Sequence, residues 1–118
     1  MGNEFIINLV KRFMDLNVLT KSLTNFYIDY DKARSGIAHD EQDTFIHLVE
    51  EVGELAAEFV NQKYRKARFT QEKYDDAVGD ILINLLYLAG IKNIDLELLL
   101  RNTVIRDAKK FNLAAPEM

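Results

Sequence analysis

The sequence contains no cysteine and no tryptophan, and it has only one proline and five glycines among its 118 residues. Without cysteine there can be no disulfide framework, no thiolate zinc site and no cysteine nucleophile. The remaining composition, 48% apolar and 29% charged, is typical of a folded chain and not of a disordered one. A chain of this length predicts one domain, spanning residues 1–118, with its own hydrophobic core.

A basic excess and a long apolar run are also missing. The chain carries 19 acidic residues against 15 lysines and arginines, a formal net charge of −4, which argues against a general nucleic-acid binder. The longest strongly apolar stretch, Ala77–Ile91, is interrupted by Asp80 and Asn84 and is shorter than the ~20 residues of a membrane helix. We therefore expect a cytoplasmic protein whose partners include neither nucleic acid nor a membrane.

Apolar residues recur at helical spacing along most of the chain, and no stretch alternates with the period of a strand. The predicted fold is an all-α bundle of four or five helices, in which residues 40–111 carry the functional motifs and the N-terminal helices within 4–34 are variable. The expected helices are Glu4–Leu16, Thr20–Arg34, Asp40 or Asp43 to Tyr64, Gln71–Ala89, and Asp95 to about Phe111. The residues expected to cap or end them are Asp40 or Asp43, Thr70, Asp95, Gly36 and Gly90. The apolar residues expected to face the core from the third helix are Phe45, Leu48, Val49, Val52, Leu55, Ala56 and Phe59.

Acidic side chains form a stripe on each of two expected helices. The stripe on the third helix consists of His47, Glu51, Glu54 and Glu58, and that on the fourth of Lys73, Asp76, Asp80, Asn84 and Tyr87. Two such stripes would repel each other unless a cation lay between them, and clustered carboxylates suit Mg²⁺ or Mn²⁺. The alternative is that the glutamates form a solvated face and that Asp80 pairs with a nearby lysine or arginine.

Other residues near the stripes carry less information. Gly53 and Gly79 lie inside helices, which suggests a close approach of a ligand or simply a helix crossing. Glu50 points away from the other acids. His47 is expected to pack and not to bind metal, and His39 carries no functional signal.

The run Glu50-Glu51-Val52-Gly53-Glu54-Leu55, followed later by Val78-Gly79-Asp80-Ile81-Leu82, resembles the MazG-like all-α nucleoside triphosphate pyrophosphatases. The signature of that family is EExxE, a spacer, and then ExxD. The resemblance covers roughly residues 45–111. It implies hydrolysis of a nucleoside triphosphate to the monophosphate and pyrophosphate, with the house-cleaning of non-canonical nucleotides as one role.

The resemblance implies that Glu51, Glu54 and Asp80 hold Mg²⁺, with Mn²⁺ as a possible substitute. Metal ions neutralise the anionic oxygens of a triphosphate, and a carboxylate positions or deprotonates the attacking water. Glu50 and Glu54 are both candidates for that catalytic role, and the sequence does not choose between them.

The chain departs from the family pattern at two places. Ala77 replaces the glutamate of ExxD, and Asp76, one turn before Asp80, is expected to supply a metal-binding oxygen instead. The family's C-terminal lysine and asparagine fall on Thr103 and Asp107, and only its last base is retained, as Lys110. The residues expected to contact the substrate are Asn84, Arg106, Lys109 and Lys110, and those considered for stacking on a base are Phe26, Tyr27, Tyr30, Phe45, Asn84 and Tyr87.

Three hypotheses of function follow. The first is a Mg²⁺-dependent nucleoside triphosphate pyrophosphohydrolase. The second, motivated by Ala77, is a catalytically weakened relative that binds nucleotide without turning it over. The third is a purely structural helical oligomer whose acids are solvated. Because one helix pair cannot enclose a nucleotide, and because family members commonly oligomerise, we expect a homodimer or homotetramer.

Overall fold

The computed structural model describes residues 3–4 and 15–117. This part of the chain is all-α, as predicted, and contains no strand. Its elements are α2 (Leu16–Ser35), α3 (Glu41–Tyr64), the short 3-10 helix η1 (Lys66–Arg68), α4 (Gln71–Ile91) and α5 (Leu96–Lys110). Most of the predicted first helix, Glu4–Leu16, lies outside the described residues, and its last residue, Leu16, opens α2 instead.

Side-chain caps fix the helix starts that the sequence predicts. Asp40 and Asp43 form a reciprocal capping box at the start of α3, in which the Asp40 carboxylate accepts a hydrogen bond from the Asp43 amide at 2.8 Å. Thr70 and Asp95 cap α4 and α5 by accepting hydrogen bonds from the backbone amides of Lys73 and Leu98. Gly36, with a φ of 86°, ends α2 in the left-handed conformation that favours glycine.

Two helix boundaries differ from the prediction by more than one residue. Helix α2 begins four residues before Thr20, because the Asp15 carboxylate accepts a hydrogen bond from the Val18 amide at 3.0 Å and so caps an earlier turn. Helix α4 runs through Gly90 to Ile91, so the prediction that Gly90 ends this helix was wrong.

Gly90 is needed for the contact between α2 and α4. A Cβ atom at this position would overlap the side chain of Thr24, which is buried on α2. The absence of a side chain therefore lets the two helices approach closely.

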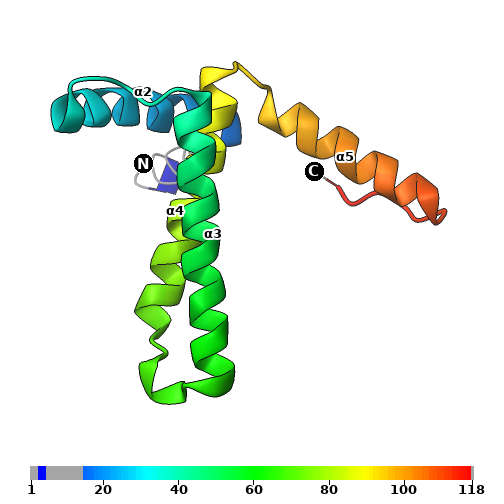
Figure 1. The fold of residues 1–118 in the computed structure, drawn as a ribbon. Coiled ribbons are helices and arrows are strands. Elements are labelled where there is room, and N and C mark those ends of the chain that lie inside the picture. The colour runs from blue at the N-terminus through cyan, green and yellow to red at the C-terminus, as the bar shows by residue number, and fades with distance from the viewer. Residues whose placement is uncertain (1–2, 5–14, 118) are drawn as a thin grey trace.

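Helices α3 and α4 form an antiparallel hairpin connected through η1, and α2 crosses the end of the hairpin that is far from η1 (Figure 1). Helix α5 turns away from α4 at 107° and extends to one side (Figure 1). Its start is held by Asn17 of α2, whose amide donates to Asp95 at 2.8 Å and accepts from the Leu96 backbone amide at 3.0 Å. None of the described helices is long and apolar enough by itself to span a membrane; α4 and α5 reach that length and hydropathy only as a bent pair.

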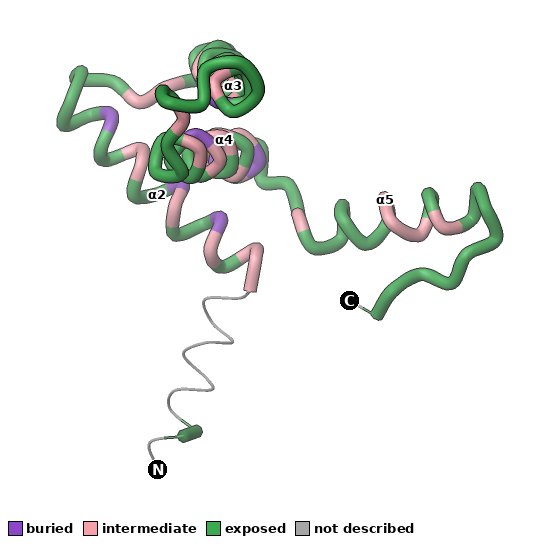
Figure 2. Tube along the Cα trace, turned by 90° about the horizontal axis from the view of Figure 1, so that it is seen from below, coloured by how far each residue is buried: buried purple, intermediate pink, exposed green. Residues whose placement is uncertain are grey.

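The described part of the chain has very little core. Its buried apolar residues are Ala77, Tyr87 and Ala89, and α5 has no buried residue at all (Figure 2). The accessible surface is 9372 Å², whereas a compact monomer of 13.6 kDa exposes about 6,600 Å². The radius of gyration, 17.8 Å, likewise exceeds the ~13.5 Å of a compact domain of this length.

The apolar face expected to line the core from α3 is largely exposed. Leu48 and Leu55 are half-buried, but the others, namely Phe45, Val49, Val52, Ala56 and Phe59, are exposed, so that part of the prediction was wrong. The reason is that α4 packs against the adjacent face of α3, where Thr44 and Glu58 are buried.

Candidate functional site

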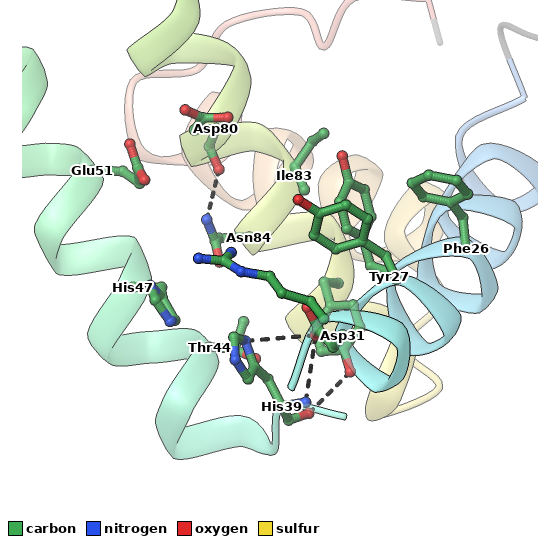
Figure 3. A pocket seen from close by; sticks show the side chains of 13 residues that line it. Phe26, Tyr27, Asp31, His39, Thr44, His47, Glu51, Asp80, Ile83 and Asn84 are labelled. Atoms are coloured by element: carbon green, nitrogen blue, oxygen red, sulfur yellow. Dashed lines mark hydrogen bonds and ion pairs between the residues drawn. The ribbon is translucent and has the colours of Figure 1, made fainter. Parts of the chain in front are cut away.

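A pocket of about 420 Å³ lies between α2, α3 and α4, and we call it the interhelical pocket (Figure 3). Its lining consists of Phe26, Tyr27, Tyr30, Asp31, Arg34, His39, Thr44, His47, Glu51, Asp80, Ile83, Asn84 and Tyr87. Glu51 and Asp80 lie toward one end and the rings of Phe26 and Tyr27 toward the other, while Asp31 lies beside His39, away from the other two acids (Figure 3). The pocket therefore offers one region suited to cations and one suited to a planar ring.

Glu51 of α3 and Asp80 of α4 mark the acidic end, on opposite sides of the gap between the helices (Figure 3). One carboxylate oxygen of Glu51, Oε2, is buried without a hydrogen-bond partner. The pKa of Glu51 is raised from its ordinary value of 4.5 to about 7. Burial is the largest cause, and Glu54 adds to it through a hydrogen bond and charge repulsion; the charges of Asp80 and Glu50 add further repulsion.

A second hollow of about 400 Å³, which we call the acidic groove, continues from Asp80 along the hairpin. It is lined by Glu54, Ala57, Glu58, Lys73, Asp76, Ala77 and Asp80. Asp80 lines both hollows, so the two form neighbouring parts of one acidic region. Ala77 is only 3% exposed, which places it against α3 and not at the surface.

The acidic region has donors that suit a divalent cation, although they are not gathered around one point. In the described part of the chain, no group of three or more histidine, aspartate or glutamate side chains is arranged as metal ligands are. Without a cation, mutual repulsion keeps such carboxylates apart. Their oxygen chemistry and the unpartnered oxygen of Glu51 fit Mg²⁺ or Mn²⁺, because either ion would supply the partner that this oxygen lacks.

The aromatic end of the pocket is built by α2. Phe26 packs edge-on against Tyr27, with ring centroids 5.0 Å apart, and stacks with Tyr30 at 6.1 Å. Phe26 and Tyr30 are also exposed, at 57% and 46%. Rings that are held by one another and still accessible can stack on a planar ligand.

Two histidines line the α3 side of the pocket, and the sequence analysis missed one of them (Figure 3). His39 stacks on His47 with ring centroids 4.8 Å apart, and its Nδ1 lies 3.5 Å from the carboxylate of buried Asp31. The hydroxyl of Tyr87 donates to the His39 carbonyl at 2.9 Å, which ties this loop to α4. No local pattern marks His39, because its place depends on how the α2–α3 turn folds back over α4.

The structure brings together five of the residues predicted to bind metal or substrate. Four of the predicted stacking residues, Phe26, Tyr27, Tyr30 and Tyr87, also line the interhelical pocket. Glu51, Asp80 and Asn84 line the interhelical pocket, while Glu54 and Asp76 join Asp80 in the acidic groove. The Asn84 amide donates to the Asp80 backbone carbonyl at 2.8 Å, which orients its side chain at the pocket wall.

The other residues predicted for catalysis, substrate binding or stacking lie elsewhere, and among them Phe45 is exposed outside both hollows. Glu50 has a side chain 62% exposed and lies 3.4 Å from Nδ1 of His47, outside both hollows. Arg106, Lys109 and Lys110 lie on α5, where Arg106 and Lys110 contact Asp107 at 3.2 and 3.8 Å. Within one chain, α5 projects away from the hairpin and does not bring these bases to the pocket (Figure 1).

The two helical glycines of the motif also lie apart from any contact. A Cβ atom at Gly53 or at Gly79 would meet no other atom within 4 Å. Neither glycine therefore serves a crossing between the helices that the structure describes.

Comparison of the chain with models of known protein families, with curated proteins and with solved structures gives no match.

Proposed function

We propose that the chain is a cytoplasmic, Mg²⁺-dependent nucleoside triphosphate pyrophosphohydrolase of the MazG-like type. The observation that carries the proposal is the setting of Glu51, a carboxylate with an unpartnered buried oxygen and a pKa of about 7, beside Glu54 and Asp80. Such a group requires either a proton or a cation to offset its charge. The adjoining aromatic rings supply a surface for a nucleobase.

In the proposed reaction, a water oxygen bonds to the α-phosphorus of the nucleotide, and the bond from that phosphorus to the oxygen bridging to the β-phosphorus breaks. The products are a nucleoside monophosphate and pyrophosphate, and the water proton passes to a carboxylate. Glu51, Glu54 and Asp80 would hold Mg²⁺, with Asp76 as a further donor, and the ion would offset the charge of the phosphate oxygens. Glu54 is the better candidate to accept the proton, because it lines the acidic groove and Glu50 does not.

The base would lie toward α2, between the acidic region and the rings of Phe26, Tyr27 and Tyr30. Asn84, whose amide is fixed at the pocket wall, would contact the sugar or base. Arg34 also lines this pocket and is a basic side chain that would contact phosphate there.

The test is a pyrophosphate-release assay over a panel of canonical and non-canonical (d)NTPs with Mg²⁺ or Mn²⁺. Wild type should release pyrophosphate, and Glu54→Gln should lower kcat by on the order of 100-fold or more. Glu72→Gln, which removes an exposed carboxylate from the first turn of α4, is the matched control and should be fully active. An inactive wild type whose melting temperature is unchanged by metal and nucleotide together would refute the proposal.

A second candidate, a relative that binds nucleotide without hydrolysing it, is favoured by one observation. Ala77, at the position of the family's fourth acidic ligand, is buried and contributes no oxygen. This candidate predicts that wild type is stabilised by nucleotide and metal yet releases no pyrophosphate, and that Ala77→Glu gains activity.

We further propose that the chain works as a homodimer or homotetramer. Large apolar side chains are exposed along α3, among them Phe45, Val49, Val52 and Phe59. An exposed apolar face of this kind is typical of an interface with another molecule. A second copy would cover the exposed apolar face of α3, and its α5 could bring Arg106, Lys109 and Lys110 to the site. The third hypothesis, a structural oligomer without activity, also predicts a homodimer or homotetramer. It differs in predicting that wild type releases no pyrophosphate and gains no stability from metal and nucleotide.

A further inference from the structure

We propose that Glu58 is an additional metal-binding residue, which supplies from α3 the carboxylate that is missing from α4 at Ala77. This inference rests on the proposed function, because it concerns the same cation. It extends the metal set beyond the residues that the motif resemblance implies.

Glu58 is buried in a way that an ordinary surface glutamate is not. It is only 5% exposed, and its Oε1 atom is buried without any hydrogen-bond partner. Its other oxygen accepts one hydrogen bond, from the Asn61 side-chain amide at 3.3 Å. Lys73 lines the same groove, but none of the ion pairs among the described residues joins it to Glu58. A carboxylate left in this condition is destabilising unless something else satisfies it.

The position of Glu58 directs it toward the other acids. Glu51, Glu54 and Glu58 are three, four and seven residues apart, so they share one face of α3. Glu58 lines the acidic groove together with Glu54, Asp76 and Asp80. The unpartnered oxygen of Glu58 is therefore buried beside a hollow that already has three carboxylates around it.

Ala77 explains why the carboxylate can come from α3. Ala77 lines the same groove as Glu58 and is 3% exposed, so a methyl group stands where a longer side chain would fill the space. A glutamate at 77 and a glutamate at 58 would reach into one hollow from its two sides. The small residue on α4 and the buried acid on α3 are thus complementary.

A hard divalent cation is the ligand that this arrangement fits. Each donor is a carboxylate oxygen, and no sulfur or histidine lines the groove. A cation would give Oε1 of Glu58 its missing partner and would offset the repulsion among the acids. A purely structural role for Glu58 would instead be served as well by an uncharged glutamine of the same shape.

The experiment measures Mn²⁺ binding to the full chain by calorimetry, without nucleotide, together with melting temperatures with and without Mn²⁺. Glu58→Gln should weaken Mn²⁺ binding by on the order of 10- to 100-fold. It should also raise the melting temperature of the metal-free protein, because it removes a buried charge. Glu72→Gln, an equal change of charge on an exposed part of α4, should alter neither quantity.

A second pair of variants separates ligation from packing. Glu58→Ala should lose Mn²⁺ affinity, and the double variant Glu58→Ala with Ala77→Glu should recover it to within about threefold of wild type, since the carboxylate returns from the opposite helix. Circular dichroism would confirm equal helicity in all variants.

The outcomes distinguish this inference from the proposed function. If Glu51→Gln abolishes Mn²⁺ binding while Glu58→Gln binds as wild type does, the role of Glu58 is refuted and the proposed function stands. An unrescued double variant would also count against it. If wild type binds no Mn²⁺ and hydrolyses no nucleotide, both proposals fall together.

Discussion

Helix α3 presents two seams of side chains with the same heptad spacing and opposite surroundings. The seam against α4 consists of Thr44, Leu48, Glu51, Leu55 and Glu58, and the seam facing solvent consists of Phe45, Val49, Val52, Ala56 and Phe59. The covered seam holds two acids with unpartnered buried oxygens, while nothing among residues 3–4 and 15–117 covers the apolar seam. A globular protein normally has the reverse arrangement. This contrast is what the proposed cation site would require on the covered seam and what the proposed second copy would require on the apolar seam.

The largest expected effect comes from placing a charge in the exposed apolar seam. If a second copy covers Val52, then Val52→Asp buries an unpaired carboxylate and costs about 3 kcal/mol, or on the order of 100-fold in the association constant. Light scattering after size-exclusion chromatography should show a shift from oligomer to monomer. Gln62→Asp adds the same charge at an exposed polar position of α3 and should leave the mass unchanged. A monomeric wild type would contradict the proposed assembly.

Two glycines of α4 allow a packed position to be compared with an open one: Gly90 lies against Thr24 of α2, and Gly79 has no neighbour within 4 Å. Gly90→Ala should lower the free energy of unfolding by ~1–3 kcal/mol, because the new Cβ overlaps Thr24. Gly79 faces open space in the same helix, so Gly79→Ala should raise the free energy of unfolding by ~0.5–1 kcal/mol. Chemical denaturation measures both. If a partner chain approaches at Gly79, this substitution would destabilise instead, and the effect would depend on protein concentration.

The covered seam predicts a pH dependence of stability. The folded-state pKa of Glu51, about 7, is above its ordinary value of 4.5, so the folded protein holds this proton more tightly than the unfolded chain does. The contribution of Glu51 to the free energy of unfolding is therefore fully present below pH 4.5, and it is lost as the pH rises toward and through 7. Denaturation of the metal-free protein from pH 4.5 to 8 should show this decline. Glu51→Gln should flatten it, and an unchanged slope would mean that other groups are responsible.

The smallest expected effect concerns α5, which has little other support. Asn17→Ala removes hydrogen bonds to Asp95 and to the Leu96 amide, and it should cost about 1 kcal/mol, the usual value for losing a cap. Amide hydrogen exchange should show faster exchange in α5 and little change in α3. Asn25→Ala, at an exposed position of α2, is the control. Uniform protection of α5 in both variants would show that something other than this cap holds the helix.

The covered seam was easier to predict than the exposed one, for a physical reason. Helical spacing places Glu51, Glu54 and Glu58 on one face whatever packs against it, so the acidic stripe could be identified without a structure. The same spacing identifies Phe45 and Val52 as an apolar face. Apolarity alone, however, does not say whether a face is covered by its own chain or by a second molecule, and here α4 covers the other face.

The sequence by itself determined the all-α class, most helix boundaries and the two acidic stripes, because caps and helical periodicity depend on residues close together in the chain. Asp40, Thr70 and Asp95 begin their helices for that reason. Only the tertiary structure decided that Glu58 is buried beside Ala77, that His39 stacks on His47, and that α5 leaves the hairpin. Those features depend on how helices distant in sequence cross. Gly90 illustrates this, because a glycine that allows close contact with Thr24 looks the same in the sequence as a glycine that ends a helix.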